Sequence, residues 1–364
     1  VLCNSSSFND SVLMIKTNLL TPLICVALLL SACDSTPPEY RATHYVFGTL
    51  VEFTVYGSDA ETSRQAIAAV GADFRTFHND WHAWQPGKLT ELNALLGDGQ
   101  THRLEPTLVP LFEQSIELAQ LSQGLFNPAI GKLIDLWGFH GDTPPVGPPP
   151  DADEISRLVK LDPQMADLIL AGKAPDQLTL RSSNPAGQYD FGGFAKGYAI
   201  ELAQQKMQAA GITNAIVNAG GDLCVMGDHG TRPWRIAIRD PRHFGVLAEI
   251  ALTDGECAMT SGNYERFRKY NDRRYAHIID PRTGWPVDHI ASATVIAKDG
   301  GMADAAATAL AVAGPAEWPK IARSMQLTQA LLVDDNGRIH VSRALYPRLI
   351  WPEGVPADLI IIDL

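Results

Sequence analysis

Residues 190–199 read DFGGFAKGYA and join an expected strand at 188–191 to an expected helix at 195–210. Two glycines at a strand-to-helix turn let the backbone approach a ligand closely, and the start of a helix offers unpaired N–H groups. Alone, the stretch also suits a tight structural turn with a surface lysine. The elements predicted on either side follow no regular βαβ period, which favours an α+β fold over a doubly wound one.

Hydrophobic periodicity predicts these other elements. Helices are expected at 61–78, 106–122 and 303–313. Strands are expected at 44–56 with an interruption at Gly48, and at 178–181, 215–217, 224–226, 234–238, 248–252, 275–278, 292–297, 330–333 and 338–341. The proline-rich stretch 141–153 cannot be regular structure, and we interpret it as an exposed loop within one domain that spans 44–364.

Composition limits the class of protein. Of the 364 residues 46% are hydrophobic and 19% charged, which is typical of a folded globular enzyme and argues against disorder. The formal net charge of −12 excludes a general nucleic-acid binder, because phosphate contacts need a basic surface. An anionic cofactor could still bind where a metal or backbone N–H groups supply positive potential.

The N-terminus is typical of a lipoprotein leader. A short positive region at 14–16 precedes an apolar run at 19–30, which is too short to span a bilayer but suits a signal peptide. The run ends in Leu30-Ser31-Ala32-Cys33, which resembles a lipobox, so residues 1–33 are expected to comprise an upstream stretch and a signal peptide, with Cys33 lipidated. An ordinary secretory signal is the alternative. Asp34 resembles an inner-membrane retention signal, and 34–43 would form a tether.

Beyond the leader only Cys224 and Cys257 remain. In an oxidising compartment they could form a disulfide, but they could equally be buried free thiols on strands.

Three further stretches carry polar groups at turns. NAGGDLCVMG (218–227) repeats the Gly-Gly pattern before an acid, and AMTSGNYERF (258–267) offers hydroxyls beside N–H groups suited to phosphate. His277 lies close to the polar turn 280–284, as a structural residue or a catalytic base. In GGMADAAATALAVAG (300–314), Asp304 and Thr308 share one helical face, where they could bind Mg²⁺ or serve the helix itself.

Together these stretches resemble the ApbE family of FAD:protein FMN transferases. WHAWQPGKLTELN (81–93) and GLFNPAIGKLIDLWGF (124–139) add to the resemblance, which extends from about residue 44 to 345. It implies an ApbE-like (T-fold-like) α+β fold with mixed, largely antiparallel sheets and helices around one flavin-binding cleft. Two residues depart from the family pattern, namely Phe47 where Met is usual and Gly87 where Ser is usual.

The resemblance also implies site residues. Mg²⁺ would be held by the side chains of Asp304 and Thr308 and the carbonyl of Gly193, which is often Ala in the family, a change that a backbone ligand should tolerate. His277 would be the general base, with Lys196 as a second catalytic residue. The residues implied to contact FAD are Thr49, Trp84, Asn93, Asp190, Gly192, Gly220, Gly221, Asp222, Thr260, Ser261, Gly262 and Tyr264. Candidates to stack on the flavin ring are Trp84, Tyr198 and Tyr264.

The implied reaction moves FMN from FAD to a Ser or Thr hydroxyl of an extracytoplasmic protein and releases AMP. Implied acceptors are subunits of sodium-pumping NADH:quinone reductase, Rnf-type complexes or related redox proteins. The enzyme would act on the periplasmic face of the inner membrane, held by its lipid anchor. An FAD pyrophosphatase and a non-catalytic FAD-binding lipoprotein are the alternatives.

Overall fold

The computed structural model describes residues 37–364 except 142, 175 and 176, and residues 38–364 form one unit. The expected leader and Cys33 lie outside the described residues. The tether is shorter than predicted, because residues 39–43 already belong to strand β1, Glu39–Val46, which pairs along its whole length with β2. Across the described residues, no helix combines the length and the apolarity needed to cross a bilayer.

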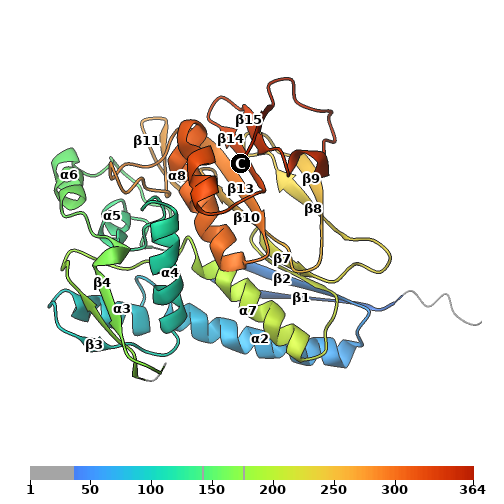
Figure 1. The fold of residues 1–364 in the computed structure, drawn as a ribbon, viewed down its shortest axis with the longest axis horizontal. Helices are drawn as coiled ribbons and strands as arrows, with labels where there is room; N and C mark the ends of the chain where they lie inside the picture. Colours follow the sequence, from blue (N-terminus) through green and yellow to red (C-terminus); the bar gives the residue numbers. More distant parts are fainter. Residues whose placement is uncertain (1–36, 142, 175–176) are drawn as a thin grey trace, which may run out of the picture. The chain divides into compact units, whose positions relative to one another are not determined.

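A nine-stranded sheet forms the centre of this unit (Figure 1). Its pairs are antiparallel except β15 with β17, which is parallel. In spatial order the strands are β1, β2 (Thr49–Tyr56), β6 (Ala215–Ala219), β7 (Asp222–Met226), β10 (Cys257–Gly262), β13 (Ile290–Ala297), β14 (Ala330–Asp334), β15 (Ile339–Ser342) and β17 (Ile360–Ile362).

Period-two alternation gives this sheet two buried faces. On β7, Cys224 belongs to the larger core, whereas Leu223 and Val225 belong to a second one. Helices α2 (Ala60–Asp80), α7 (Ala195–Ala209) and α8 (Gly300–Ser324) cover the first face. A small sheet of β8 (Trp234–Arg239), β9 (Val246–Leu252) and β16 (Leu349–Ile350) packs on the second.

The remaining elements are α3 (Lys88–Leu96), β3 (His102–Arg103), α4 (Val109–Leu121), α5 (Gly131–Leu136), α6 (Ala152–Lys160), η1 (Met165–Asp167), β4 (Leu168–Ala171), β5 (Thr179–Ser182), β11 (Phe267–Tyr270), β12 (Arg273–Ala276) and η3 (Tyr346–Arg348). In Figure 1 the labelled ones, α3, β3, α4, α5, α6, β4 and β11, lie to the left of α7. The short helix η3 instead leads into β16 and packs against the second core through Tyr346. Strands β3, β5 and β4 form a three-stranded sheet, and β11 with β12 forms a separate hairpin.

The α+β prediction is confirmed, and two predicted strands are wrong in detail. Residues 188–191 form a single parallel bridge rather than a strand. Gln188 and Asp190 bond the backbone of residues 128–131, whereas both backbone groups of Tyr189 bond the side chain of Asn93 in place of a second strand. Strand β12 ends at Ala276, so His277 lies just beyond a strand rather than within one.

Cys224 and Cys257 form a disulfide between the neighbouring strands β7 and β10. The two residues face each other in the strand register, with Cα atoms 3.9 Å apart. This resolves the question that the sequence left open.

Candidate functional site

Lys196 lies in the first turn of α7, where its ammonium contacts Asp222 at the start of β7. Asp222 is almost fully buried, and its second oxygen accepts a hydrogen bond of 2.9 Å from the backbone N–H of Thr260. Burial alone would lower the pKa of Lys196, but the carboxylates of Asp222 and Asp304 raise it, so the lysine stays charged. The Gly-Gly turn, the second glycine motif and the Thr-Ser-Gly strand therefore meet at one ion pair.

The two helices that carry the other predicted residues cross in contact with each other. Asp304, in α8, accepts a hydrogen bond of 3.0 Å from the backbone N–H of Gly197 in α7. One turn later, the hydroxyl of Thr308 lies 3.1 Å from that of Ser261. A Cβ added at Gly193 would lie 2.8 Å from Thr308 Oγ1, so the turn before α7 packs directly on this hydroxyl.

These groups suit a hard divalent cation. Carboxylate, hydroxyl and carbonyl oxygens are the donors that Mg²⁺ prefers, with ligand phosphates completing its shell. Burial and the charge of Asp222 raise the pKa of Asp304 to about 7, with Lys196 opposing them, so a bound cation would favour the charged form. No cluster of three or more His, Cys, Asp or Glu side chains suited to a metal exists among the described residues, and this set includes only one carboxylate.

The same contact bears on Gly193, where a backbone ligand was expected to tolerate alanine. That tolerance stays a prediction, but in this chain an added Cβ would lie closer to Thr308 than ordinary contacts allow, so the threonine hydroxyl would have to shift. In this chain the glycine therefore leaves room for the threonine hydroxyl.

His277 directly follows the β11–β12 hairpin and is held by Arg266, the residue that directly precedes that hairpin. Both its backbone N–H and its ring atom Nδ1 lie 3.1 Å from the carbonyl oxygen of Arg266. A carbonyl can only accept, so Nδ1 carries the proton and Nε2 of the neutral ring keeps its lone pair. Burial lowers the pKa of His277 to about 4, and the positive charges of Arg266 and Lys196 act in the same direction. The ring is therefore neutral near pH 7.

The carboxylate of Asp190 forms a buried pair with His140. Its Oδ2 lies 2.9 Å from His140 Nε2, and its Oδ1 accepts from the backbone N–H of Gly192 at 2.8 Å. Burial opposes ionisation, yet the bonds from His140 and Gly192 hold the pKa of Asp190 below its usual value. Trp84 stacks on His140 at 5.3 Å between ring centroids, with the guanidinium of Arg266 on the indole at 5.8 Å.

His140 and Arg266 were missed by the sequence reasoning. Arg266 donates to the carbonyls of Phe139 and Gly141 and so joins the hairpin of His277 to the segment of His140. Arg266 lies within the AMTSGNYERF stretch and His140 directly follows GLFNPAIGKLIDLWGF, but nothing local in either stretch marked these two side chains.

Thr49 and Tyr264 pack against glycines of the predicted FAD-binding stretches. Thr49 lies against the second Gly-Gly turn, since a Cβ at Gly220 would lie 2.5 Å from its hydroxyl, and Gly220 and Gly221 both have positive φ. Tyr264 packs against Gly262, and the guanidinium of Arg239 lies 4.8 Å from its ring centroid.

The roles of Asn93 and Gly87 have structural explanations that need no ligand. Asn93 braces residues 188–191 as described above. Gly87 replaces the family's usual serine at a place where an added Cβ would lie 2.0 Å from the carbonyl oxygen of Asn79, so this backbone path has no room for a side chain.

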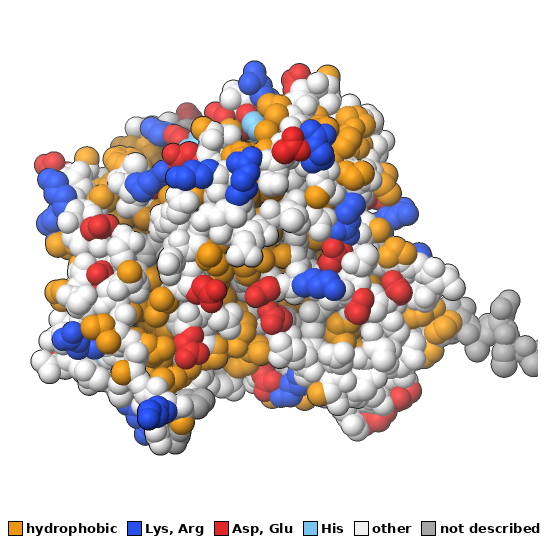
Figure 2. Space-filling view, in the orientation of Figure 1, with side chains coloured by type: hydrophobic (Ala, Val, Ile, Leu, Met, Phe, Trp, Pro, Cys, Tyr) orange, Lys and Arg blue, Asp and Glu red, His pale blue; other side chains and the backbone are white. Residues whose placement is uncertain are grey.

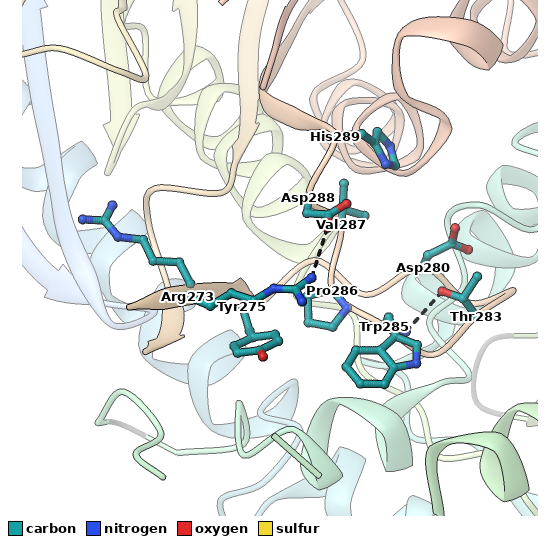
Figure 3. A pocket seen from close by; sticks show the side chains of 10 residues that line it. Arg273, Tyr275, Asp280, Thr283, Trp285, Pro286, Val287, Asp288 and His289 are labelled. Carbon is teal, nitrogen blue, oxygen red and sulfur yellow. Dashed lines mark hydrogen bonds and ion pairs between the residues drawn. The ribbon is translucent and has the colours of Figure 1, made fainter. Parts of the chain in front are cut away.

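A cavity of about 370 Å³ lies beside the hairpin of His277 rather than at the helix crossing. Figure 3 shows its lining, with Arg273 extending to Asp288 and the ring of Trp285 on the opposite side. A second cavity, of about 260 Å³, includes Asn93.

The arrangement can perform acid–base and phosphate chemistry. It combines a neutral imidazole whose Nε2 can accept a proton, a charged lysine, and a carboxylate and a hydroxyl one turn apart on α8. Helix α7 also presents its N-terminus at the Gly-Gly turn, where N–H groups favour a phosphate.

Comparison with known proteins gives consistent matches. The model of the ApbE family matches residues 47–332. The FAD:protein FMN transferase of Rhodobacter capsulatus is 46% identical over 328 residues, which cover 90% of this chain but only 62% of that protein. The enzyme of the same name from Treponema pallidum is 28% identical over 90% of this chain and 94% of its own length.

Two solved structures have the same fold. The ApbE protein of Thermotoga maritima has a TM-score of 0.75 and 28% identity, covering 85% of this chain and 99% of its own. The flavinyl transferase ApbE of Pseudomonas stutzeri has a TM-score of 0.74 and 27% identity, covering 88% and 98%.

Proposed function

The chain belongs to the ApbE family, and we propose on that basis that it is an FAD:protein FMN transferase. It would transfer the FMN moiety of FAD to a Ser or Thr hydroxyl of an acceptor protein and release AMP. Its relatives from Rhodobacter capsulatus and Treponema pallidum carry this enzyme name.

The orientation of His277 is the observation that carries this proposal. The ring is held by a carbonyl through Nδ1, which leaves Nε2 to accept a proton. Its lowered pKa keeps it neutral at pH 7, and the charge of Lys196 is close enough to contribute to that shift. A general base beside groups that can bind phosphates is what transfer of a phosphoryl group to a hydroxyl requires.

In the proposed reaction, the acceptor hydroxyl oxygen forms a bond to the FMN phosphorus. The bond from that phosphorus to the bridging oxygen breaks, and AMP leaves with the electron pair. Nε2 of His277 takes the hydroxyl proton. Lys196 stays protonated throughout and offers positive charge to the phosphates, although Asp222 holds it in place.

Asp304, Thr308 and the carbonyl of Gly193 would hold Mg²⁺, which when bound would supply positive charge for the diphosphate of FAD. The contacts of Thr308 with Ser261 and with the Gly193 turn support this set. The N–H groups of Gly193 and Gly220, one from each Gly-Gly turn, would bind the same phosphates from the protein side, since those of Gly192 and Gly221 already donate to Asp190 and Asn218.

We also propose a location outside the cytoplasm. The lipobox-like sequence ending at Cys33 supports a lipid anchor, and the Cys224–Cys257 disulfide suits an oxidising compartment. Acceptors on the periplasmic face of the inner membrane would then be flavoprotein subunits of sodium-pumping NADH:quinone reductase or Rnf-type complexes. A shared membrane would raise their effective concentration.

The proposal is tested by incubating the purified protein with FAD, Mg²⁺ and a candidate acceptor subunit. Transfer predicts a fluorescent flavin band at the mass of the acceptor on a denaturing gel, with one AMP released for each flavin attached. Release of FMN and AMP without a labelled band would instead identify a pyrophosphatase. Unchanged FAD would identify a flavin-binding protein without activity. Omission of Mg²⁺ and mutation of the acceptor hydroxyl are the controls.

A further inference from the structure

We propose that the hairpin of residues 265–276, here called the basic hairpin, and the cavity beside it together bind an acidic, extended segment of the acceptor protein. This inference rests on the proposed function and specifies the partner of the same site. The hairpin contains strands β11 and β12 and leads directly into His277.

The charge of the basic hairpin is opposite to that of the protein. Residues 265–276 hold five Lys and Arg residues and two Asp and Glu residues, a net charge of +3, whereas the whole chain has −12. Figure 2 shows Lys and Arg side chains gathered on the face where Figure 1 labels β11. Such a local reversal of charge favours anionic partners at this place.

Carboxylates balance these cations only in part. Arg266 and Arg268 each donate to two backbone carbonyls, which fix the hairpin against residues 137–148 without neutralising it. Lys269 and Arg273 have exposed partners, at 3.8 and 3.3 Å. Arg274 packs on the ring of Phe267 and has no ion pair with any described residue.

The cavity described above adjoins these cations. Three consecutive β12 residues line one side of it, Arg273, Arg274 and Tyr275, and its other lining residues include Trp285 and His289 (Figure 3). Its two acidic residues are already engaged, because Asp280 pairs with Arg282 and Asp288 with Arg273. A cavity of about 370 Å³ has room for side chains of a peptide.

The strand arrangement favours a peptide over a membrane surface. Among the described strands, β12 pairs only with β11, so its outer edge can accept an extended segment. A segment along β12 leads to His277, whose ring and backbone both bond Arg266 at the base of the same hairpin. An acidic stretch on the hairpin would therefore bring a nearby hydroxyl to Nε2.

Fluorescence anisotropy with two labelled peptides tests this inference on the full-length protein. One peptide has a single Thr flanked by Asp residues, and the other has Asn at every Asp position. Wild-type protein should bind the Asp peptide roughly tenfold more tightly at low salt, and added salt should reduce this preference. The double variant R273Q/R274Q should lose it, whereas the matched variant R64Q/R75Q on α2 should keep it.

Thermal unfolding midpoints establish that both double variants fold. Equal binding of the two peptides by the wild type, or an unchanged preference in R273Q/R274Q, would overturn the inference. So would a protein that ignores both peptides but binds phosphatidylserine vesicles through Arg273 and Arg274. A wild type that prefers the Asp peptide yet labels no acceptor with flavin would support the surface and contradict the proposed function, so the two failures are distinguishable.

Discussion

His277 combines two properties that a general base needs at neutral pH. Its orientation is set by the Arg266 carbonyl, and its neutrality is set by burial and by neighbouring positive charge. The same Arg266 anchors the segment of His140 through the carbonyls of Phe139 and Gly141. Arg266 therefore has two roles: its backbone carbonyl orients His277, and its side chain fixes the segment of His140.

The lowered pKa of His277 predicts the pH dependence of transfer. The base acts only when unprotonated, which holds above its pKa of about 4. The value of kcat/KM should therefore stay level from about pH 8 down to about pH 5 and fall below that, whereas an ordinary histidine would lose activity from about pH 6.5. Initial rates of AMP release with acceptor present measure this profile. With saturating Mg²⁺, which keeps Asp304 charged, a midpoint near 6.5 would contradict the environment assigned to His277.

Removal of the imidazole should separate binding from chemistry. In His277→Gln the dissociation constant for FAD, measured by flavin fluorescence, should change little, while single-turnover transfer slows by roughly two to four orders of magnitude. His243→Gln, which changes an exposed loop histidine, is the matched control and should keep the wild-type rate. A wild-type rate in His277→Gln would exclude the histidine as the base.

Gly193 is predicted to matter because of its neighbour. In Gly193→Ala the new Cβ would displace the Thr308 hydroxyl, which lies only 2.8 Å from that position, and Mg²⁺ affinity with FAD present should fall by roughly tenfold or more. Isothermal titration calorimetry measures this affinity. If the hydroxyl is the cause, Gly193→Ala should have almost no additional effect in a Thr308→Ala background. Full additivity would contradict this explanation.

At the scale of elements, the site depends on how closely α7 and α8 approach. A Cβ at Gly197 would lie 2.1 Å from the carbonyl oxygen of Gly300 and 2.8 Å from Asp304 Cβ. The absence of a side chain there lets the Gly197 N–H reach Asp304. The helix crossing thus determines where the predicted metal ligand lies.

This close approach predicts a stability effect. Gly197→Ala should lower the free energy of unfolding by about 1–3 kcal/mol or more, because the obstacle is backbone that cannot rotate away. Urea denaturation measures the change. Gly97→Ala is the control, since its Cβ would meet only the Pro185 carbonyl oxygen at an ordinary 3.8 Å and φ there is −67°, and it should shift the midpoint little. Equal stability of both variants would contradict the packing argument.

The elements with a clear hydrophobic period could be predicted from sequence, and those set by long-range contacts could not. Helix α2 and the β14–β15 hairpin follow local pattern and turn signals. Residues 188–191 also look like a strand, but the backbone groups of Tyr189 bond the Asn93 side chain, nearly a hundred positions earlier, and only Gln188 and Asp190 bond backbone, at residues 128–131. No local signal reports that contact.

The candidate site shows the same division. The motifs predicted that the two Gly-Gly turns belong to one site, and the Lys196–Asp222 ion pair joins them, although that pairing itself was not predicted. The motifs did not predict that His140 pairs with Asp190, because that contact joins segments fifty positions apart. They also did not predict the basic hairpin, since its significance depends on the cavity and on the position of His277.

At the scale of the whole molecule, the disulfide joins the two strands that carry Asp222 and Thr260. It closes a loop with a sequence separation of 33 residues. A cross-link of this length restricts the unfolded chain and typically contributes about 2–4 kcal/mol.

The double variant Cys224→Ala/Cys257→Ala should therefore unfold at a lower urea concentration than the wild type. Its free energy of unfolding should be lower by about 2–4 kcal/mol. Reduction of the wild type with a phosphine should produce a similar shift, and reductant should not affect the variant. A variant as stable as the oxidised wild type would contradict a stabilising role for the disulfide.

The proposed reaction depends most on three oxygen donors, from α8 and the turn before α7, that would meet at one cation beside the FAD diphosphate. Anomalous diffraction from crystals grown with FAD and Mn²⁺ in place of Mg²⁺ tests this directly. We predict one Mn²⁺ at about 2.0–2.3 Å from Asp304, Thr308 and the Gly193 carbonyl, in contact with the diphosphate. Mn²⁺ bound elsewhere, or a diphosphate distant from Asp304 and Thr308, would contradict it.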